Sequence, residues 1–378
     1  MNSVKQWSSM IGFAVILLLS QSSAAQVQPS FPKPSGPFDV GRLEIDLTDA
    51  SREEVFTDAP ADRRRLLVSL YYPAAVPADG KHGAYGTSEL AAVWPFFNEE
   101  RRAWLSPGYA GVPVADGSFP VLVFSPGAGN LTLYYSSLLY EIASRGFVIA
   151  ALWHPYSTEV VAFPDGTVLR SNPAGGMNGV PPGEQQAKLE RLGAVWAADQ
   201  RFVLDQCTAW NTQHSVLRGH LDLQRVGAFG HSLGGAAAAQ AAHVDQRIDA
   251  AVNMDGAMFG TVTTDGSRVP FLLLEAERPV LSDGELKQVG MTREQADAWI
   301  ASLVNVQAST IARSREARSR KLERSKHNTF MTDLLFFTTA LPTARRAALV
   351  GDVDPVPTFN QISTWVGEFM AAHVQGAK

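Results

Sequence analysis

The sequence predicts a single α/β domain built on a mostly parallel central sheet with helices on both faces. Short apolar runs alternate with helix-forming segments along most of the 378 residues, and such alternation is typical of β-α-β units. No internal repeat is visible, and no linker divides the chain into independent halves. We expect one domain over residues 26–378, with surface insertions at about 74–118 and 157–215.

Short apolar runs bounded by turn residues mark the expected strands. They are residues 66–72, 119–124, 147–152, 225–229, 248–254 and 269–275. Residues 131–145 carry apolar side chains at helical spacing and stop at Gly146, and residues 184–212 are predicted to form one or two helices.

Composition and charge exclude several functional classes. Hydrophobic residues make up 46% and charged residues 18%, which is the usage of a globular protein and not of a disordered one. The net charge of −5 argues against a nucleic-acid partner, because such proteins are strongly basic. A single cysteine, Cys207, rules out an intramolecular disulfide framework and a cysteine-rich zinc site. The sequence does not decide the oligomeric state.

The first 25 residues have the pattern of a secretory signal peptide. Lys5 supplies the positive charge, residues 11–19 are apolar, and the small residues 23–25 follow. The apolar run is shorter than the roughly 20 residues that a bilayer-spanning helix needs. We expect export, to the periplasm or beyond, after cleavage near Ala25, and no later segment is apolar enough to cross a membrane.

Residues 230–234 read Gly-His-Ser-Leu-Gly, a G-x-S-x-G pattern between the expected strand 225–229 and the helix-forming run 233–242. A serine in a sharp strand-to-helix turn needs small neighbours, and its hydroxyl is then presented above the sheet. The N-terminus of the following helix favours developing negative charge. The pattern therefore predicts Ser232 as a nucleophile.

A serine hydroxyl needs a base, and on this kind of fold the chain order is serine, acid, histidine. Three histidines follow Ser232: His243, His327 and His373. His243 lies on the helix that leaves the turn, and His373 lies on a C-terminal helical pattern. His327 lies in a polar loop and is the predicted base, whereas His231 is expected to pack beside the nucleophile.

Two carboxylates compete to orient His327. Asp255 and Glu275 each follow directly on an expected strand, at the carboxyl end where parallel sheets gather their active groups. Spacing alone does not separate them. For the oxyanion, the Leu233 amide is one candidate donor, and the glycine-containing loop 124–129 is the expected source of a second.

Two groups of side chains follow strand ends near this centre and are candidate walls of a substrate pocket, with core packing as the alternative. They are Trp153, His154, Tyr156, Met258 and Phe259. Residues 313–326 hold seven basic and two acidic residues. We expect this run to form a solvated helix face.

Six stretches of the chain resemble the plasma-type platelet-activating factor acetylhydrolases, within the wider α/β-hydrolases that include dienelactone hydrolases. They are LLVSLYYP, FPVLVFSPGAG, LYEIASRGFVIAALWHPYS, RVGAFGHSLGG, NMDGAMF and SKHNTF. The resemblance implies an α/β-hydrolase fold with Ser232 as nucleophile, His327 as base and Asp255, rather than Glu275, as acid. It also implies oxyanion donation by the Ala128 and Leu233 amides. Pro126 departs from the histidine of many relatives, but proline there removes no implied donor.

Together these features predict an exported serine esterase that acts on short acyl esters, either lipid esters or polyester-like substrates, without a metal or organic cofactor. Two alternatives remain open from the sequence. One is a peptidase or amidase that uses the same residues, and the other is a catalytically silent binding protein on this fold.

Overall fold

The computed structural model describes residues 29–177, 179–278 and 280–376. The expected signal peptide, residues 1–25, lies outside this part of the chain. In the described ranges no helix is both long and apolar enough to cross a membrane.

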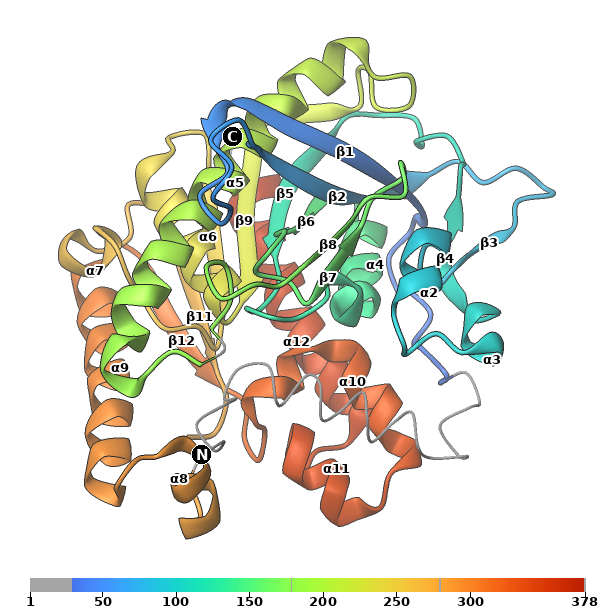
Figure 1. Ribbon diagram of the computed structural model, residues 1–378. Helices are drawn as coiled ribbons and strands as arrows, with labels where there is room; N and C mark the ends of the chain where they lie inside the picture. Colours follow the sequence, from blue (N-terminus) through green and yellow to red (C-terminus); the bar gives the residue numbers. More distant parts are fainter. Residues whose placement is uncertain (1–28, 178, 279, 377–378) are drawn as a thin grey trace.

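A ten-stranded sheet forms the centre of the molecule, in the order β12-β11-β10-β9-β5-β6-β2-β1-β4-β3 (Figure 1). The six strands from β12 to β6 are parallel, and β2 pairs antiparallel with both β6 and β1. The strands span β1 Asp39–Glu53, β2 Arg63–Ala74, β3 His82–Ala84, β4 Leu105–Ala110, β5 Phe119–Ser125, β6 Val148–Trp153, β9 Leu221–His231, β10 Ala250–Met254, β11 Phe271–Glu275 and β12 Ala317–Lys321. A separate hairpin joins β7 Val160–Ala162 and β8 Val168–Arg170.

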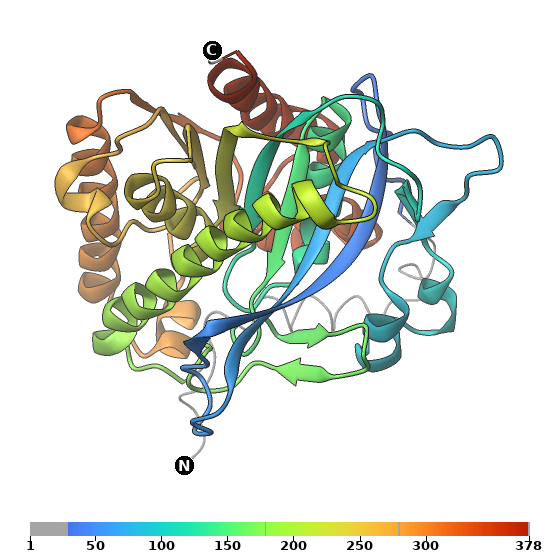
Figure 2. The same ribbon diagram turned by 90° about the horizontal axis from the view of Figure 1, so that it is seen from above.

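Helices cover both faces of this sheet, as the view from above shows most clearly (Figure 2). One face carries α5 and α6, and the other carries α4, α10 and α12. The longer helices are α4 Ser136–Ser144, α5 Gln185–Gln213, α6 Leu233–Val244, α9 Arg293–Arg313, α11 Thr343–Val350 and α12 Pro355–Met370. The short ones are α2 Ser88–Val93, α3 Glu99–Arg102, α7 Val262–Asp265, α8 Asp283–Val289 and α10 Thr332–Phe337.

The apolar strands are buried on both sides, and alternate residues enter different cores. Along β5, Val121 and Val123 pack with α5 and α6, whereas Leu122 and Phe124 pack with α4 and α12. Successive side chains of a strand point to opposite faces, so a strand between two helical layers must be apolar throughout. Each of the six expected strands overlaps a strand of the sheet, and the predicted α/β fold is confirmed.

The sequence prediction missed β1, β3, β4, β7, β8 and β12, and two of these, β1 and β12, are mostly polar. β1 is a long strand near one edge, and β12 forms the opposite edge with the sequence Ala-Arg-Ser-Arg-Lys. The expectation of a helix face for residues 313–326 was therefore wrong, since α9 ends at Arg313 and β12 follows. Charged side chains on an edge strand discourage pairing with another sheet.

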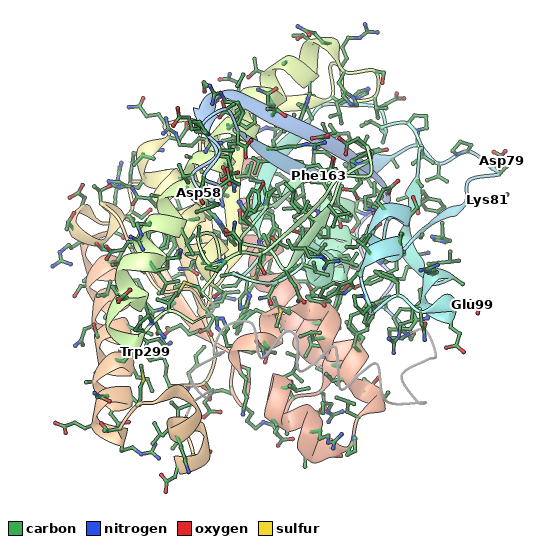
Figure 3. The ribbon with its side chains drawn as sticks, in the orientation of Figure 1. Asp58, Asp79, Lys81, Glu99, Phe163 and Trp299 are labelled. Carbon is green, nitrogen blue, oxygen red and sulfur yellow. The ribbon has the colours of Figure 1, made fainter. Side chains whose placement is uncertain are left out.

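The chain between β2 and β5 extends the sheet at the edge opposite β12. It contributes β3, β4 and the short helices α2 and α3. The loop before β3 projects outward and carries Asp79 and Lys81 near its tip (Figure 3). The chain between β6 and β9 contributes the β7–β8 hairpin and the single long helix α5.

Candidate active site

Ser232 occupies the turn between β9 and α6 in a strained backbone conformation. Its φ of 54° and ψ of −124° lie in a region that side-chain-bearing residues rarely adopt. The Ser232 N–H donates to the Met254 carbonyl at 2.9 Å, which ties the turn to the neighbouring strand β10. Such strain persists only where the surrounding structure enforces it, and it is typical of functional residues.

The glycines of this turn are required by close packing. A Cβ atom at Gly234 would lie 2.2 Å from the Ser125 carbonyl oxygen, and one at Gly230 would lie 2.5 Å from the Gly234 carbonyl carbon. Neither distance leaves room for a side chain. The G-x-S-x-G spacing therefore reflects the contact between the turn and the end of β5.

The structure brings His327 to Ser232. The His327 Nε2 atom lies 3.0 Å from the Ser232 Oγ atom, and the His327 side chain is 46% exposed. His327 begins a 3₁₀ helix, His327–Phe330, that follows β12. The Thr329 hydroxyl anchors this helix, because it donates to the Val350 carbonyl at 2.6 Å and accepts from the Lys326 N–H at 2.8 Å.

The structure also brings Asp255 to His327, directly after β10. The Asp255 Oδ2 atom lies 2.7 Å from His327 Nδ1, and the Ala276 N–H donates to Asp255 Oδ1 at 2.9 Å. Asp255 has a positive φ of 55°, and its side chain is nearly buried. Glu275 instead pairs with Arg278 at 2.6 Å. The geometry thus separates two carboxylates that spacing leaves equivalent.

Replacing Asp255 by asparagine is expected to lower kcat by about 10⁴-fold, because an amide cannot stabilise the imidazolium and favours the wrong histidine tautomer. Glu275→Gln is the matched control and is expected to change kcat by less than about threefold. Steady-state kinetics of the two variants on one ester test the assignment. A larger loss of kcat in Glu275→Gln than in Asp255→Asn would contradict the assignment.

The other two candidate bases lie elsewhere. His243, on α6, has its Nε2 atom 3.3 Å from Asp265. His373, in the π-helical segment Ala371–Gln375 after α12, has its Nε2 atom 3.7 Å from Glu316. Each is therefore engaged by a carboxylate away from the Ser232 hydroxyl.

The loop after β5 is the expected source of a second oxyanion donor. The Gly127 N–H donates to the Tyr135 hydroxyl and the Gly129 N–H donates to the Ser157 carbonyl, whereas the Ala128 N–H has no acceptor among the described residues. Leu233 is the first residue of α6, and the N–H groups of a first helical turn have no intrahelical acceptor. Both backbone donors implied by the family resemblance are thus free to bind an oxyanion.

Beneath this loop lies a buried polar network. The Ser125 hydroxyl meets His154 Nε2 at 3.0 Å and Gln200 Nε2 at 2.9 Å, and His154 Nδ1 meets Asp199 at 2.8 Å. Arg64 completes the network with two hydrogen bonds to the Asp199 carboxylate. All five side chains are fully buried or nearly so.

The charges in this network are balanced. Burial lowers the pKa of His154, so its ring is neutral and donates its Nδ1 proton to Asp199. Burial would raise the pKa of Asp199, but the Arg64 guanidinium and the His154 hydrogen bond outweigh burial and hold it well below its usual range. The neutral His154 ring then accepts the Ser125 hydroxyl proton at Nε2. Ser125, His154 and Asp199 are hydrogen-bonded in the same serine–histidine–aspartate order as Ser232, His327 and Asp255. The first three side chains are buried, however, and they stabilise the loop after β5.

Asp199→Asn is expected to reduce the free energy of unfolding by about 3–5 kcal/mol, because it leaves the buried Arg64 charge without its main partner. Urea unfolding of the variant measures this loss. Asp205→Asn on the same helix, whose side chain is largely exposed and pairs with Arg247, is the control and is expected to cost less than about 1 kcal/mol. Equal effects of the two changes would contradict this reading of the network.

The candidate pocket residues divide into two groups. Trp153 donates its indole N–H to Ser69, His154 stacks on Trp196 with ring centroids 3.8 Å apart, and the Met258 side chain is buried. These three make core contacts. Phe259 and Tyr156 instead join a cluster that includes Leu233 and Ala128, the two expected oxyanion donors. Tyr156 has a positive φ of 66°.

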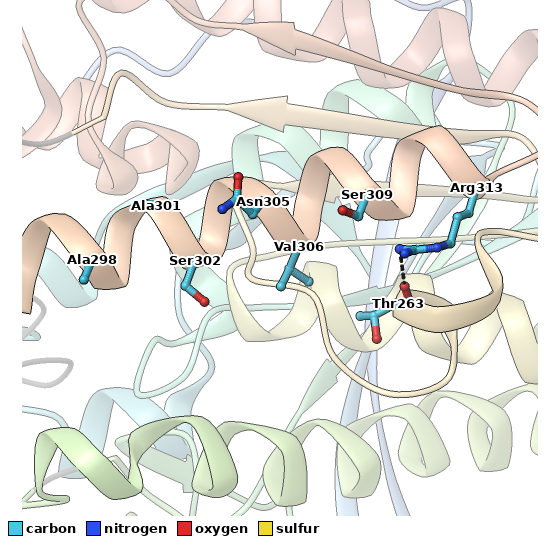
Figure 4. Close-up of a pocket in the computed structure, with 8 residues that line it drawn as sticks. All are labelled: Thr263, Ala298, Ala301, Ser302, Asn305, Val306, Ser309 and Arg313. Atoms are coloured by element: carbon cyan, nitrogen blue, oxygen red, sulfur yellow. Dashed lines mark hydrogen bonds between the residues drawn. The ribbon is translucent and has the colours of Figure 1, made fainter.

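A separate surface groove of about 600 Å³ runs along α9 (Figure 4). Small and polar side chains of that helix line it, and the Arg313 guanidinium at its end donates to the Thr263 carbonyl at 3.2 Å. None of Ser232, Asp255 and His327 lines this groove. Trp299 projects from the same helix and is 37% exposed (Figure 3). Within the described ranges, no three histidine, cysteine, aspartate or glutamate side chains are grouped to hold a metal ion.

Comparison with known proteins identifies relatives of the chain. The family model described as platelet-activating factor acetylhydrolase, isoform II, matches residues 107–163 and 198–303, a range that includes Ser232 and Asp255 and ends before His327. A probable 1-alkyl-2-acetylglycerophosphocholine esterase of Arthroderma benhamiae is 28% identical over 277 residues, or 68% of this chain and 66% of that protein. The chain is thus similar to the platelet-activating factor acetylhydrolases over much of its length.

Further proteins show the same similarity. The platelet-activating factor acetylhydrolase of Cavia porcellus is 23% identical over 64% of this chain and 58% of its own length. The matches thus span two thirds or less of these relatives. A solved structure, a ferulic acid esterase from Streptomyces cinnamoneus, is similar over 93% of this chain and 94% of its own, with a TM-score of 0.72 and 25% sequence identity.

Proposed function

We propose that the protein is a serine carboxylic-ester hydrolase that acts through an acyl-enzyme. The observation that carries the proposal is the continuous hydrogen-bonded chain from Ser232 through His327 to Asp255, with distances of 3.0 and 2.7 Å. This is the arrangement in which a histidine activates a serine hydroxyl and a carboxylate orients the histidine.

The reaction takes place in two steps. His327 accepts the Ser232 proton at Nε2 while the Ser232 oxygen attacks the ester carbonyl, and Asp255 stabilises the imidazolium that forms. The amides of Ala128 and Leu233 donate to the oxyanion, where each donor is typically worth about 3 kcal/mol. The imidazolium then protonates the leaving alcohol. A water molecule then gives a proton to His327 as its oxygen attacks the acyl-enzyme carbonyl, and the imidazolium returns that proton to the Ser232 oxygen as the acid leaves.

Esters are the favoured substrate class because two of the similar proteins are named esterases and a third is named an acetylhydrolase. Two act on acetylated glycerophospholipid esters by their names, and one is a ferulic acid esterase. The shared bond is a carboxylic ester with a small or planar acyl group. We therefore propose short acyl esters as substrates, either lipid esters of the platelet-activating factor type or polyester-like chains.

A panel of p-nitrophenyl esters from acetate to octanoate, beside a peptide p-nitroanilide, tests the proposed substrate class. We expect turnover of the esters, with kcat/KM highest for acetate or butyrate, and no detectable cleavage of the anilide. Faster cleavage of the anilide would favour an amidase. Absence of turnover on every substrate, with no labelling of Ser232 by a fluorophosphonate, would favour a binding protein.

We also propose that the protein is exported, on the pattern of Lys5, the apolar run 11–19 and the small residues 23–25. Expression of the full chain in a bacterial host with a secretory pathway is expected to give a mature protein that begins at Gln26. N-terminal sequencing of the periplasmic and medium fractions measures this. Recovery of only the uncleaved chain from the cytoplasm would contradict export.

A further inference from the structure

A chain of buried hydrogen bonds connects the oxyanion loop to the main chain of His327. The Gly127 N–H lies 3.0 Å from the Tyr135 hydroxyl, which lies 2.7 Å from His231 Nδ1. His231 Nε2 in turn lies 3.1 Å from the carbonyl oxygen of His327. Tyr135 and His231 are completely buried, and the mechanism above uses neither of them.

The direction of each hydrogen bond in this chain follows from elementary chemistry. A carbonyl oxygen only accepts, so His231 Nε2 must carry the proton that reaches the His327 carbonyl. Burial, together with the neighbouring His327, lowers the pKa of His231 well below its usual range, so the ring is neutral and its Nδ1 atom is unprotonated. The Tyr135 hydroxyl must therefore donate to His231 Nδ1, and its oxygen accepts from the Gly127 N–H.

Each end of the chain meets a part of the reaction centre. Gly127 precedes Ala128, the expected oxyanion donor, and a Cβ atom at Gly127 would lie 3.1 Å from His231 Nδ1 and 3.3 Å from the Ser232 Cβ atom. The rings of His231 and His327 lie 4.5 Å apart. The base, the nucleophile and the oxyanion loop therefore meet around one buried imidazole.

We propose that Tyr135 and His231 are positioning residues that fix His327 relative to Ser232 and the oxyanion loop. The Tyr135 hydroxyl holds His231 in the tautomer that bears its proton on Nε2, and that proton holds the His327 main chain. His327 needs such an anchor because it lies in a short 3₁₀ helix and its side chain is half exposed. This inference rests on the proposed function, since it assigns a role relative to His327 as the base.

Tyr135→Phe removes the hydroxyl and keeps the ring. We expect kcat to fall about tenfold with KM within about twofold of wild type, because a misplaced base slows the chemical step and leaves substrate binding unchanged. Tyr134→Phe is the matched control, since Tyr134 is a buried neighbour whose hydroxyl has no hydrogen-bond partner in the described residues. It is expected to leave kcat unchanged.

Two substitutions of His231 test the other half of the chain. His231→Leu removes both hydrogen bonds and is expected to lower kcat about 100-fold. His231→Gln places an amide donor near the position of Nε2, and it is expected to recover kcat to within about tenfold of wild type. A merely structural role would reduce the free energy of unfolding in both variants and leave the kcat of the folded protein unchanged.

A measurement without substrate separates this inference from the proposed function. In ¹⁵N spectra of the histidine rings of the wild-type protein, we expect His231 to be protonated at Nε2 and unprotonated at Nδ1 at neutral pH, and Tyr135→Phe to weaken this preference. Protonation of His231 at Nδ1, or wild-type kcat in Tyr135→Phe, would overturn the inference. Failure of the wild-type protein to cleave any ester would instead overturn the proposed function.

Discussion

Ser232→Ala is expected to lower the turnover of p-nitrophenyl acetate by about 10⁶-fold, the size of effect seen when the nucleophile of a serine hydrolase is removed. The reason is that no acyl-enzyme can form, and water alone must attack an ester that the oxyanion donors still polarise. Among the described residues the hydroxyl makes a single hydrogen bond, to His327, so its loss is expected to have little effect on folding.

Two measurements complete the test of this variant. The urea unfolding midpoint is expected to stay within about 0.3 M of wild type, which separates loss of chemistry from loss of structure. Ser302→Ala, at an exposed position on α9 away from the site, is the control and is expected to keep the wild-type kcat. Substantial turnover by Ser232→Ala would exclude a serine nucleophile at this position.

His327→Ala is expected to lower kcat by about 10⁴–10⁶-fold, because the Ser232 proton then has no acceptor and the leaving alcohol has no donor. The His327 side chain is 46% exposed, so added imidazole can reach the vacated space. We expect imidazole to restore part of the activity of this variant and to have no effect on Ser232→Ala.

The matched controls are the two other histidines downstream of the nucleophile. His243→Ala and His373→Ala are expected to change kcat by less than about threefold, because each ring is engaged by a surface carboxylate. Loss of activity in either of them, with activity retained in His327→Ala, would show that a different histidine is the base.

The buried strands could be predicted from the sequence because their residues are apolar. The solvent-exposed strands could not, because their residues can be polar. The strands at the centre of the sheet are apolar throughout because helices cover both of their faces. β12 is an edge strand whose basic side chains lie over aromatic rings of α12, with Arg318 above Phe369 and Arg320 above Trp365. A strand of this composition has no apolar period that sequence reasoning can detect.

At the site, residue spacing predicts the nucleophile but does not separate the two candidate acids, and the sheet explains why. Met254 and Leu274 pair in register on adjacent parallel strands, so Asp255 and Glu275 follow at the same level of the sheet. Both are thus strand-end carboxylates in equivalent positions. What separates them is local: Asp255 has a left-handed backbone, and Glu275 pairs with Arg278.

The roles inferred for Tyr135 and His231 had no signal in the sequence beyond the expected packing of His231 beside the nucleophile. Tyr135 lies 96 residues before His231, and His231 lies 96 residues before His327. Hydrogen bonds over such separations depend on the assembled sheet. Only the three-dimensional structure reveals that the loop, the nucleophile and the base share one buried imidazole.

The central claim, an acyl-enzyme on Ser232, is tested most directly by trapping that intermediate. Wild-type protein is mixed with p-nitrophenyl acetate, quenched in acid within milliseconds, and mapped by peptide mass spectrometry. We predict one acetyl group on the peptide that contains Ser232, and none on that peptide in Ser232→Ala. An acetyl group on a different residue of a protein that turns over the ester, or steady turnover without any acetylated peptide, would contradict the claim.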